Sequence, residues 1–235
     1  DYLTLDDVAL LAAATSSPQD FLEGLSERVL IDEIQRAPEL FLALKRVVDR
    51  DRTPGRFLLT GSANILTLPK LSDSLAGRME IYTLWPLSQG ELRSCKEGFI
   101  DAAFSNQKPE SVTPVTGSEW GTLLTTGGYP KSLKRSTERR RRAWFQSYLT
   151  TILQRDVRDL SNIEGITALP DLLTLLASRT GAFLNMSDLA RSINLPNTTL
   201  SRYLTLLEAV FLTVSLPAWS TNIGKRLVKS PKLYI

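Results

Sequence analysis

Apolar residues in the first third of the chain form short runs that alternate with helix-spaced positions. The runs at 2–5, 28–31 and 56–60 have the length and composition of strands, and the second reads as fully buried. The helices predicted between these strands begin at Val8, at Pro18 and at Pro38. Buried strands that alternate with helices are typical of a parallel sheet covered on both faces. We therefore predict an α/β core in this part of the chain.

The pattern loosens in the middle of the chain. Polar and turn-forming residues over 107–118 predict an exposed loop, which follows a short helix at 99–104. A helix that begins at Trp120 is expected to end at the pair Gly127-Gly128. This stretch therefore reads as a polar connection between two better-patterned regions.

A basic run comes next. Residues 135–142 hold five arginines and one glutamate, which can follow a phosphate backbone but more often form the solvated face of a helix. We favour the solvated face, because apolar residues at helical spacing follow the run. They would form the buried face of the same helix: Trp144, Phe145, Tyr148, Leu149, Ile152 and Leu153. Beyond them, charges alternate in sign at Arg155-Asp156 and Arg158-Asp159, which indicates ion pairs.

The last third of the chain has the pattern of a winged helix-turn-helix domain. A helix from Pro170 precedes a second one capped by Ser187, and a turn at 194–197 leads to a third, capped by Asn197. In this third helix three leucines face inward and small polar residues and an arginine face outward, as in a recognition helix. The inward residues are Leu200, Leu204 and Leu207, and the outward ones Thr198, Thr199, Ser201, Arg202 and Thr205. A strand at 211–216, a loop at 217–225 and a returning strand at 227–235 would form the wing.

Composition narrows the functional classes. The 235 residues are 43% hydrophobic and 23% charged, as in a folded globular chain. They include no histidine and one cysteine, Cys95, which excludes histidine-based catalysis, a cysteine and histidine zinc site and an internal disulfide. No apolar run is long enough to span a membrane and no signal pattern opens the chain, so we expect a cytoplasmic protein without a membrane partner.

Charge is distributed unevenly along the chain. Residues 1–92 carry 9 basic and 14 acidic side chains, a net charge of −5, whereas residues 93–235 carry 19 and 11, a net charge of +8. From Ala209 onward the charged residues are all basic: Lys225, Arg226, Lys229 and Lys232. The two parts of the chain are therefore expected to face different partners.

Candidate chemistry lies at the ends of the predicted strands. Asp32 and Glu33 follow one buried strand, and Thr60 and Ser62 follow the next. Ligands of parallel sheets bind beyond the carboxyl ends of the strands. An aspartate there can hold hydrated Mg²⁺ and a neighbouring glutamate can activate water. The alternative is that the acidic pair only ends the strand and caps the next helix.

The acidic pair lies in a longer motif. The run from Val29 to Leu40 resembles the Walker B segment of the bacterial AAA-type P-loop ATPase family that carries a C-terminal domain of unknown function, DUF4143. The resemblance covers nearly the whole chain. Its further segments are Leu58–Asn64, Ser74–Arg78, Leu84–Ser88, Gly127–Pro130, Tyr148–Val157 and Lys229–Tyr234.

This resemblance implies a role for each candidate residue. Asp32 would be the Mg²⁺-side carboxylate, Glu33 the water-activating base, and Thr60 or Ser62 the sensor of the γ-phosphate. Arg78 is either an arginine finger or phosphate clamp, or it forms an ordinary ion pair at a helix end. The region around Arg155 would be a helical lid, from which this arginine could reach a nucleotide. ATP and Mg²⁺ are the cofactors implied for the complete protein.

One family motif is absent from the sequence. No Gly-x-x-x-x-Gly-Lys-[Ser/Thr] loop occurs, and the nearest string is Gly224-Lys225-Arg226. In the family this loop precedes the segment that corresponds to Tyr2, and the family pattern continues beyond Ile235, so we expect a chain that lacks both ends. Without the loop amides and lysine that hold phosphates, this chain is expected to bind no cofactor itself and to be inactive as an ATPase.

The sequence predicts three parts and two functions. An ATPase core with a partial parallel sheet spans 1–92, a linker and helical lid 93–160, and a winged helix at the start of the DUF4143 domain 161–235. The leading hypothesis is that the chain is part of an ATPase that acts on DNA or a partner protein. Self-association of the chain is a further option. The alternative is a non-catalytic DNA-binding or scaffold module. The nucleic-acid-binding candidates are Arg191, Thr198, Thr199, Arg202, Lys225, Arg226 and Lys229.

Overall fold

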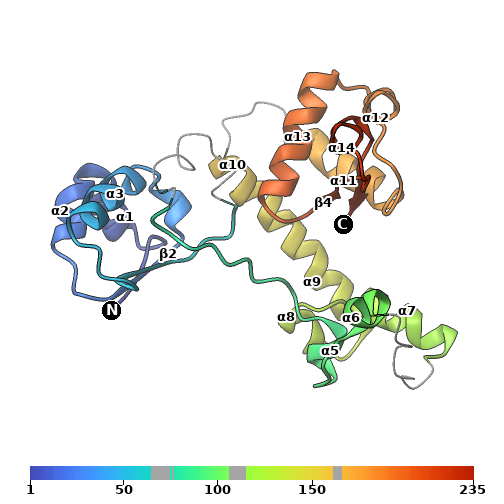
Figure 1. Cartoon of the computed structure of the whole chain (residues 1–235), viewed down its shortest axis with the longest axis horizontal. Helices are drawn as coiled ribbons and strands as arrows, with labels where there is room; N and C mark the ends of the chain where they lie inside the picture. The colour runs from blue at the N-terminus through green and yellow to red at the C-terminus, as the bar shows by residue number, and fades with distance from the viewer. Residues whose placement is uncertain (65–74, 76, 106–114, 161–165) are drawn as a thin grey trace. The chain divides into compact units, whose positions relative to one another are not determined.

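The computed structural model describes residues 1–64, 75, 77–105, 115–160 and 166–235 (Figure 1). The contacts divide the chain into two units. Unit 1 consists of Asp1–Glu80 and Thr151–Ile235, and unit 2 of Ile81–Thr150.

Three parallel strands form the sheet of unit 1. These strands are β1 (Tyr2–Thr4), β2 (Val29–Asp32) and β3 (Phe57–Leu59), in the order β1-β2-β3. The register aligns Leu3 with Ile31 and Ile31 with Leu59, so these three residues lie on one face of the sheet. The three predicted strands and their parallel arrangement are confirmed, with β3 shorter than expected.

Helices pack against one face of this sheet. They are α1 (Val8–Ser16), α2 (Pro18–Glu23) and α3 (Leu40–Arg50). The core contains Ile31 of β2, Leu22 of α2, and Phe41 and Leu44 of α3. The opposite face carries Tyr2 and Leu58, which are 62% and 59% exposed, so cover on both faces is not found among the described residues.

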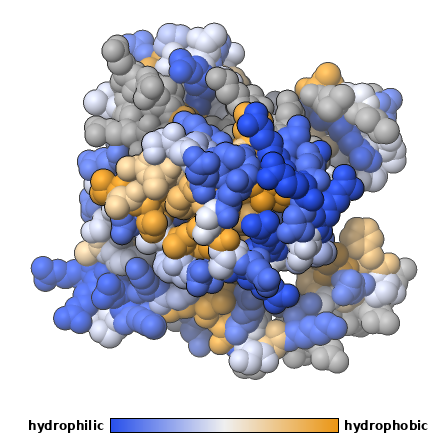
Figure 2. All heavy atoms as spheres, turned by 90° about the vertical axis from the view of Figure 1, so that its left-hand side faces the viewer, coloured by the Kyte–Doolittle hydropathy of each residue, from blue (hydrophilic) through white to orange (hydrophobic). Residues whose placement is uncertain are grey.

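Helix α1 is apolar but largely unburied. Its start is fixed by Asp7, whose carboxylate accepts hydrogen bonds from the backbone N–H groups of Ala9 and Leu10 at 2.8 and 3.2 Å. Ala14 is its one buried residue, and Val8 is 78% exposed. Figure 2 views this side of the molecule and shows apolar residues in orange among hydrophilic residues in blue.

Unit 2 is helical in the residues that the structure describes. Its elements are α5 (Gln89–Leu92), α6 (Phe99–Phe104), α7 (Gly117–Thr126), α8 (Pro130–Leu133) and most of α9 (Glu138–Thr151). Helix α7 begins earlier than predicted, because Thr116 and Glu119 form a capping box ahead of Trp120. Most of the predicted loop at 107–118 lies outside the described residues.

Helix α9 packs through a cluster of aromatic rings. Trp144 and Tyr148 stack with ring centroids 5.2 Å apart, and Tyr129 lies 5.6 Å from Trp144 and 5.1 Å from Tyr148. These rings are half-buried, whereas Ile152 and Leu153 are buried, so the expected buried face is confirmed only in part. The helix continues as a π-helical segment, η3 (Ile152–Asp156), and as α10 (Val157–Leu160).

The C-terminal part of unit 1 contains helices and a small antiparallel sheet. Its elements are η4 (Ile166–Ala168), α11 (Leu169–Ala177), α12 (Met186–Ile193), α13 (Asn197–Ala209), β4 (Val214–Leu216), α14 (Ile223–Val228) and β5 (Lys232–Tyr234). Leu200, Leu204 and Leu207 of α13 are buried, as predicted.

Two local predictions in this part were wrong, and a third is confirmed only in part. Asn185 caps α12 instead of Ser187, because the Asn185 side chain accepts the N–H of Asp188 at 3.1 Å. Asn197 is the first residue of α13 and not its cap. The two strands expected in the wing are present as the antiparallel pair of β4 and β5, but α14 replaces the end of the expected loop and the start of the returning strand. The N–H of Arg226 donates to the carbonyl of Asn222 at 3.3 Å at the start of this helix.

Length and polarity argue against a membrane-spanning helix in the described part of the chain. None of its helices combines the length and the apolar character that a bilayer crossing requires.

Candidate functional site

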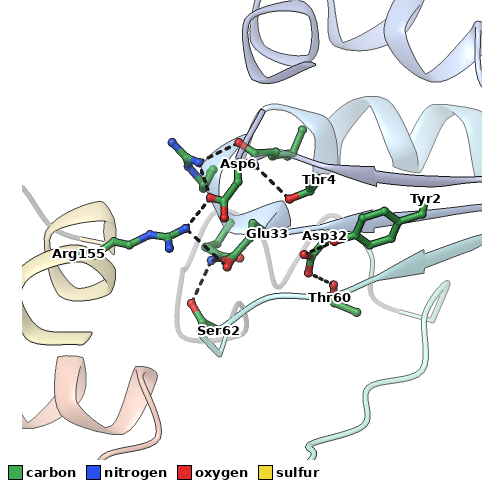
Figure 3. A network of polar contacts seen from close by, with 11 residues as sticks. Tyr2, Thr4, Asp6, Asp32, Glu33, Thr60, Ser62 and Arg155 are labelled. Atoms are coloured by element: carbon green, nitrogen blue, oxygen red, sulfur yellow. Dashed lines mark hydrogen bonds and ion pairs between the residues drawn. The ribbon is translucent and has the colours of Figure 1, made fainter. Parts of the chain in front are cut away.

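Asp32 stands at the carboxyl end of β2, on the same face of the sheet as Tyr2 and Thr4 (Figure 3). One carboxylate oxygen accepts a hydrogen bond from the hydroxyl of Thr60, and the other accepts one from the hydroxyl of Tyr2 at 2.9 Å. The Thr60 hydrogen bond is the main cause that lowers the pKa of Asp32, and burial partly opposes it. The Asp32 hydrogen bond in turn raises the pKa of Tyr2. Asp32 is therefore ionised at neutral pH.

Glu33 follows in a different backbone conformation. Its φ is 59°, in the left-handed region that residues other than glycine seldom adopt. Its carboxylate accepts a hydrogen bond from the side-chain amide of Gln35, which also donates to the Ser62 hydroxyl at 3.1 Å. The almost buried Gln35 thus joins the end of β2 to the segment that follows β3.

Arg155 reaches the same group from η3 (Figure 3). Its guanidinium lies 2.6 Å from the carboxylate of Asp6 and 3.6 Å from that of Glu33. Arg36 contacts the same Asp6 oxygen at 2.7 Å and the carbonyl of Leu5 at 2.9 Å. A chain of ion pairs therefore runs from Glu33 through Arg155 to Asp6 and Arg36.

The structure brings four of the five catalytic candidates together. Asp32 contacts Thr60, and Glu33 is joined to Ser62 through Gln35. Arg78 is the exception.

Arg78 forms a bidentate ion pair with Asp49 near the end of α3. The distances are 2.7 Å from Nε and 3.1 Å from Nη2 to the two carboxylate oxygens. This pairing lowers the pKa of Asp49 and raises that of Arg78. Of the two alternatives for Arg78, the structure shows the ion pair. The helix expected before it lies mostly outside the described residues.

The nucleic-acid candidates lie on three helices and the segment after them. Thr198 and Arg202 are exposed on α13, Thr199 is half-buried, and Arg191 on α12 lies 3.6 Å from Asp188. On α14, Arg226 bonds the carbonyl of Ser220 and lies 5.8 Å from the ring centre of Trp219. Lys229 is exposed, and the side chain of Lys225 lies outside the described part of the chain.

Four members of the site were not predicted from the sequence: Tyr2, Asp6, Gln35 and Arg36. Strand alternation could have placed Tyr2, because it shares a face of β1 with Thr4 and Thr4 aligns with Asp32. The other three gave no such signal, since their partners depend on the packing of the folded chain.

The number and type of oxygen ligands at the site determine which metal ion it could hold. Among the residues that the structure describes, no group of three or more histidine, cysteine, aspartate or glutamate side chains is arranged for a metal. Asp32 supplies one carboxylate, which fits Mg²⁺ because that ion keeps several waters and takes its remaining ligands from phosphates.

Removing the Thr60 hydroxyl is expected to raise the pKa of Asp32. Thr60→Val deletes the largest cause of the lowered pKa, and Thr60 is exposed, so packing should change little. Because the pKa of Asp32 is lower in the folded than in the unfolded protein, its ionised form stabilises the fold above about pH 4, and this stabilisation is lost as the pH falls. In the variant the two pKa values lie closer together, so acidification should reduce its free energy of unfolding less than that of the parent chain. Carboxyl-carbon NMR titration measures the shift. Thr15→Val, whose hydroxyl contacts only its own helix, should leave the pKa of Asp32 unchanged.

Two different family models match the N-terminal and the C-terminal part of the chain. Residues 1–93 match the family described as AAA domain, and residues 118–235 match a domain of unknown function, DUF8612. The second match names a different domain from the DUF4143 domain that the motifs suggested.

Two relatives align with nearly all of the chain. They are uncharacterized proteins of Mycobacterium bovis and Mycobacterium tuberculosis, each 34% identical over 224 residues. The alignment covers 95% of this chain and 46% of either relative, so the chain spans about half of their length. No solved structure matches. Residues 1–93 are thus similar to an AAA domain, and because DUF8612 covers residues 118–235, half of the chain, the chain belongs to the DUF8612 family.

Proposed function

We propose that Asp32, Glu33, Thr60 and Ser62 form the magnesium and water side of an ATP-hydrolysing site. The observation that carries this proposal is the contact of an ionised carboxylate with a hydroxyl beyond the carboxyl ends of two adjacent parallel strands. Ligands of open α/β sheets bind at this edge. The AAA match over the same residues supports nucleotide chemistry there.

Asp32 would hold Mg²⁺, either directly or through its waters. Thr60 and Tyr2 fix its two oxygens and favour the charged form. When bound, Mg²⁺ supplies charge neutralisation for phosphate oxygens. Thr60 or Ser62 would then contact the terminal phosphate.

Glu33 would accept the proton of the attacking water. Gln35 and Arg155 contact its carboxylate from two sides and so fix its orientation, and its side chain is 20% exposed, which leaves access for water. We leave Arg78 outside this site, because its contact with Asp49 already explains its position.

The phosphate-binding half of such a site has no counterpart in this sequence. It requires loop amides and a lysine, and the 235 residues contain no Gly-x-x-x-x-Gly-Lys-[Ser/Thr]. We therefore propose that these 235 residues alone bind Mg-ATP only weakly. Calorimetric titration should give no dissociation constant in the micromolar range. A micromolar constant would contradict this part of the proposal.

A second proposal concerns the C-terminal part, where the element order supports a winged helix that binds DNA. Helix α11, a β-bridge between Phe183 and Lys232, helices α12 and α13 and the β4-β5 pair follow one another as in that fold. The exposed Arg202 lies on α13, which would enter the major groove.

Replacing two basic residues tests this DNA surface. Arg202→Ala combined with Lys225→Ala should weaken binding to duplex DNA and reduce the slope of log affinity against log salt by about 2. Fluorescence anisotropy in a salt series measures both quantities. Equal affinity and slope for the variant and the parent chain would rule out this surface.

A further inference from the structure

A dense group of cations lies outside the candidate site, in unit 2. Residues 130–142, here called the basic corner, comprise α8, the turn after it and the start of α9. They contain one carboxylate, Glu138, and seven cations: Lys131, Lys134, Arg135, Arg139, Arg140, Arg141 and Arg142. The basic corner therefore carries a net charge of +6 in 13 residues.

Little of this charge is neutralised within the described part of the chain. Arg142 pairs with Glu138 at 3.2 Å, but both side chains are largely exposed, at 79% and 68%, so water screens the pair. Arg141 donates to the carbonyl of Arg135 at 3.2 Å, which ties the start of α9 to the preceding turn. The other cations of the basic corner face solvent.

Helix stability does not explain the arginines. Arg139 to Arg142 lie in the first turns of α9, where the helix dipole disfavours cations. Arg135 and Arg139, four residues apart, also add like charge to the same corner. A sequence that breaks local preferences without a structural gain indicates a functional surface.

The side chains in and next to the basic corner indicate which class of partner it binds. The apolar residues of α9 cannot insert into a lipid surface, because Trp144, Phe145 and Tyr148 pack on Tyr129. Protein interfaces are more than half apolar, whereas the exposed residues of the basic corner are mostly cationic.

We propose that the basic corner binds the sugar-phosphate backbone of a nucleic acid. Guanidinium groups bind phosphate oxygens through two parallel hydrogen bonds, and five of the seven cations are arginines. Exposed aromatic rings in the same unit, Phe99 on α6 and Trp120 on α7, are available to stack on bases. The proposal does not depend on nucleotide hydrolysis.

Fluorescence anisotropy with the 235-residue chain tests the proposal. The probes are labelled single-stranded DNA, duplex DNA and RNA of about 20 units each, titrated between about 50 and 200 mM salt. Arg139→Ala with Arg140→Ala should weaken binding at least about tenfold and reduce the duplex salt slope by about 2. Comparison of the three probes shows which nucleic acid the surface prefers.

Two control variants separate charge at this surface from net charge and from folding. Arg46→Ala with Arg52→Ala removes the same charge from exposed positions in and after α3, and should leave affinity within about twofold of the parent chain. Arg139→Lys with Arg140→Lys keeps the charge and should keep the salt slope. A lysine variant whose salt slope falls as far as that of the alanine variant would contradict a charge-based contact.

Three results would overturn the proposal. The first is no binding to any of the three probes at the lowest salt. The second is equal weakening by the α9 pair and the α3 control pair. The third is binding to vesicles that contain phosphatidylserine without competition from the oligonucleotides.

Discussion

Glu33→Gln is expected to lower the rate of ATP hydrolysis at least about a hundredfold while the affinity for Mg-ATP stays unchanged. Glutamine keeps the size of the side chain and can still contact Gln35, but it cannot accept the proton of the attacking water. The effect should therefore fall on kcat and not on binding. The assay requires a polypeptide that joins these residues to a Gly-x-x-x-x-Gly-Lys-[Ser/Thr] loop.

A matched substitution controls for the lost charge. Glu27→Gln makes the same chemical change at an exposed position ahead of β2 and should leave turnover intact. Phosphate release gives the rate, and nucleotide titration under the same conditions gives the affinity. If Glu33→Gln turned over as fast as Glu27→Gln, Glu33 would not be the base.

Gly128→Ala is expected to destabilise unit 2 by about 1–3 kcal/mol or more. A β-carbon at this position would lie 2.0 Å from the carbonyl oxygen of Leu87, and the N–H of Leu87 donates to the carbonyl of Gly128 at 2.9 Å. Neither backbone can move away without breaking this contact. Urea unfolding followed by tryptophan fluorescence measures the change.

Gly121→Ala is the control for this prediction. Gly121 lies inside α7 with open space where the β-carbon would go, so alanine should stabilise the helix by about 0.5–1 kcal/mol. The two alanine variants should thus change stability in opposite directions. Equal unfolding midpoints for both would show that Gly128 and Leu87 are not in contact.

Local pattern was enough to predict the sheet and the acidic edge of the site. Parallel strands end on one edge, so the positions of Asp32 and Thr60 after consecutive strands placed both residues at that edge. Their direct contact was not predicted. The amphipathic pattern of α13 likewise placed Leu200 and Leu204 in the core.

Long-range contacts could not be predicted in the same way. The partners Arg155 and Asp6 are 149 residues apart, and no periodicity links η3 to the segment after β1. The left-handed conformation of Glu33 was equally hidden, because residues other than glycine rarely adopt it. The helix between the two wing strands was also not predicted, because the apolar residues of 223–228 fit a short helix as well as a strand.

The most direct test of the central claim is a structure with Mg²⁺ and a non-hydrolysable ATP analogue, determined on a polypeptide that supplies the phosphate loop. We expect Mg²⁺, or one of its bound waters, within hydrogen-bond reach of the Asp32 carboxylate. We also expect the terminal phosphate next to Thr60 or Ser62. A nucleotide bound elsewhere, with Asp32 still held between Tyr2 and Thr60, would contradict the claim.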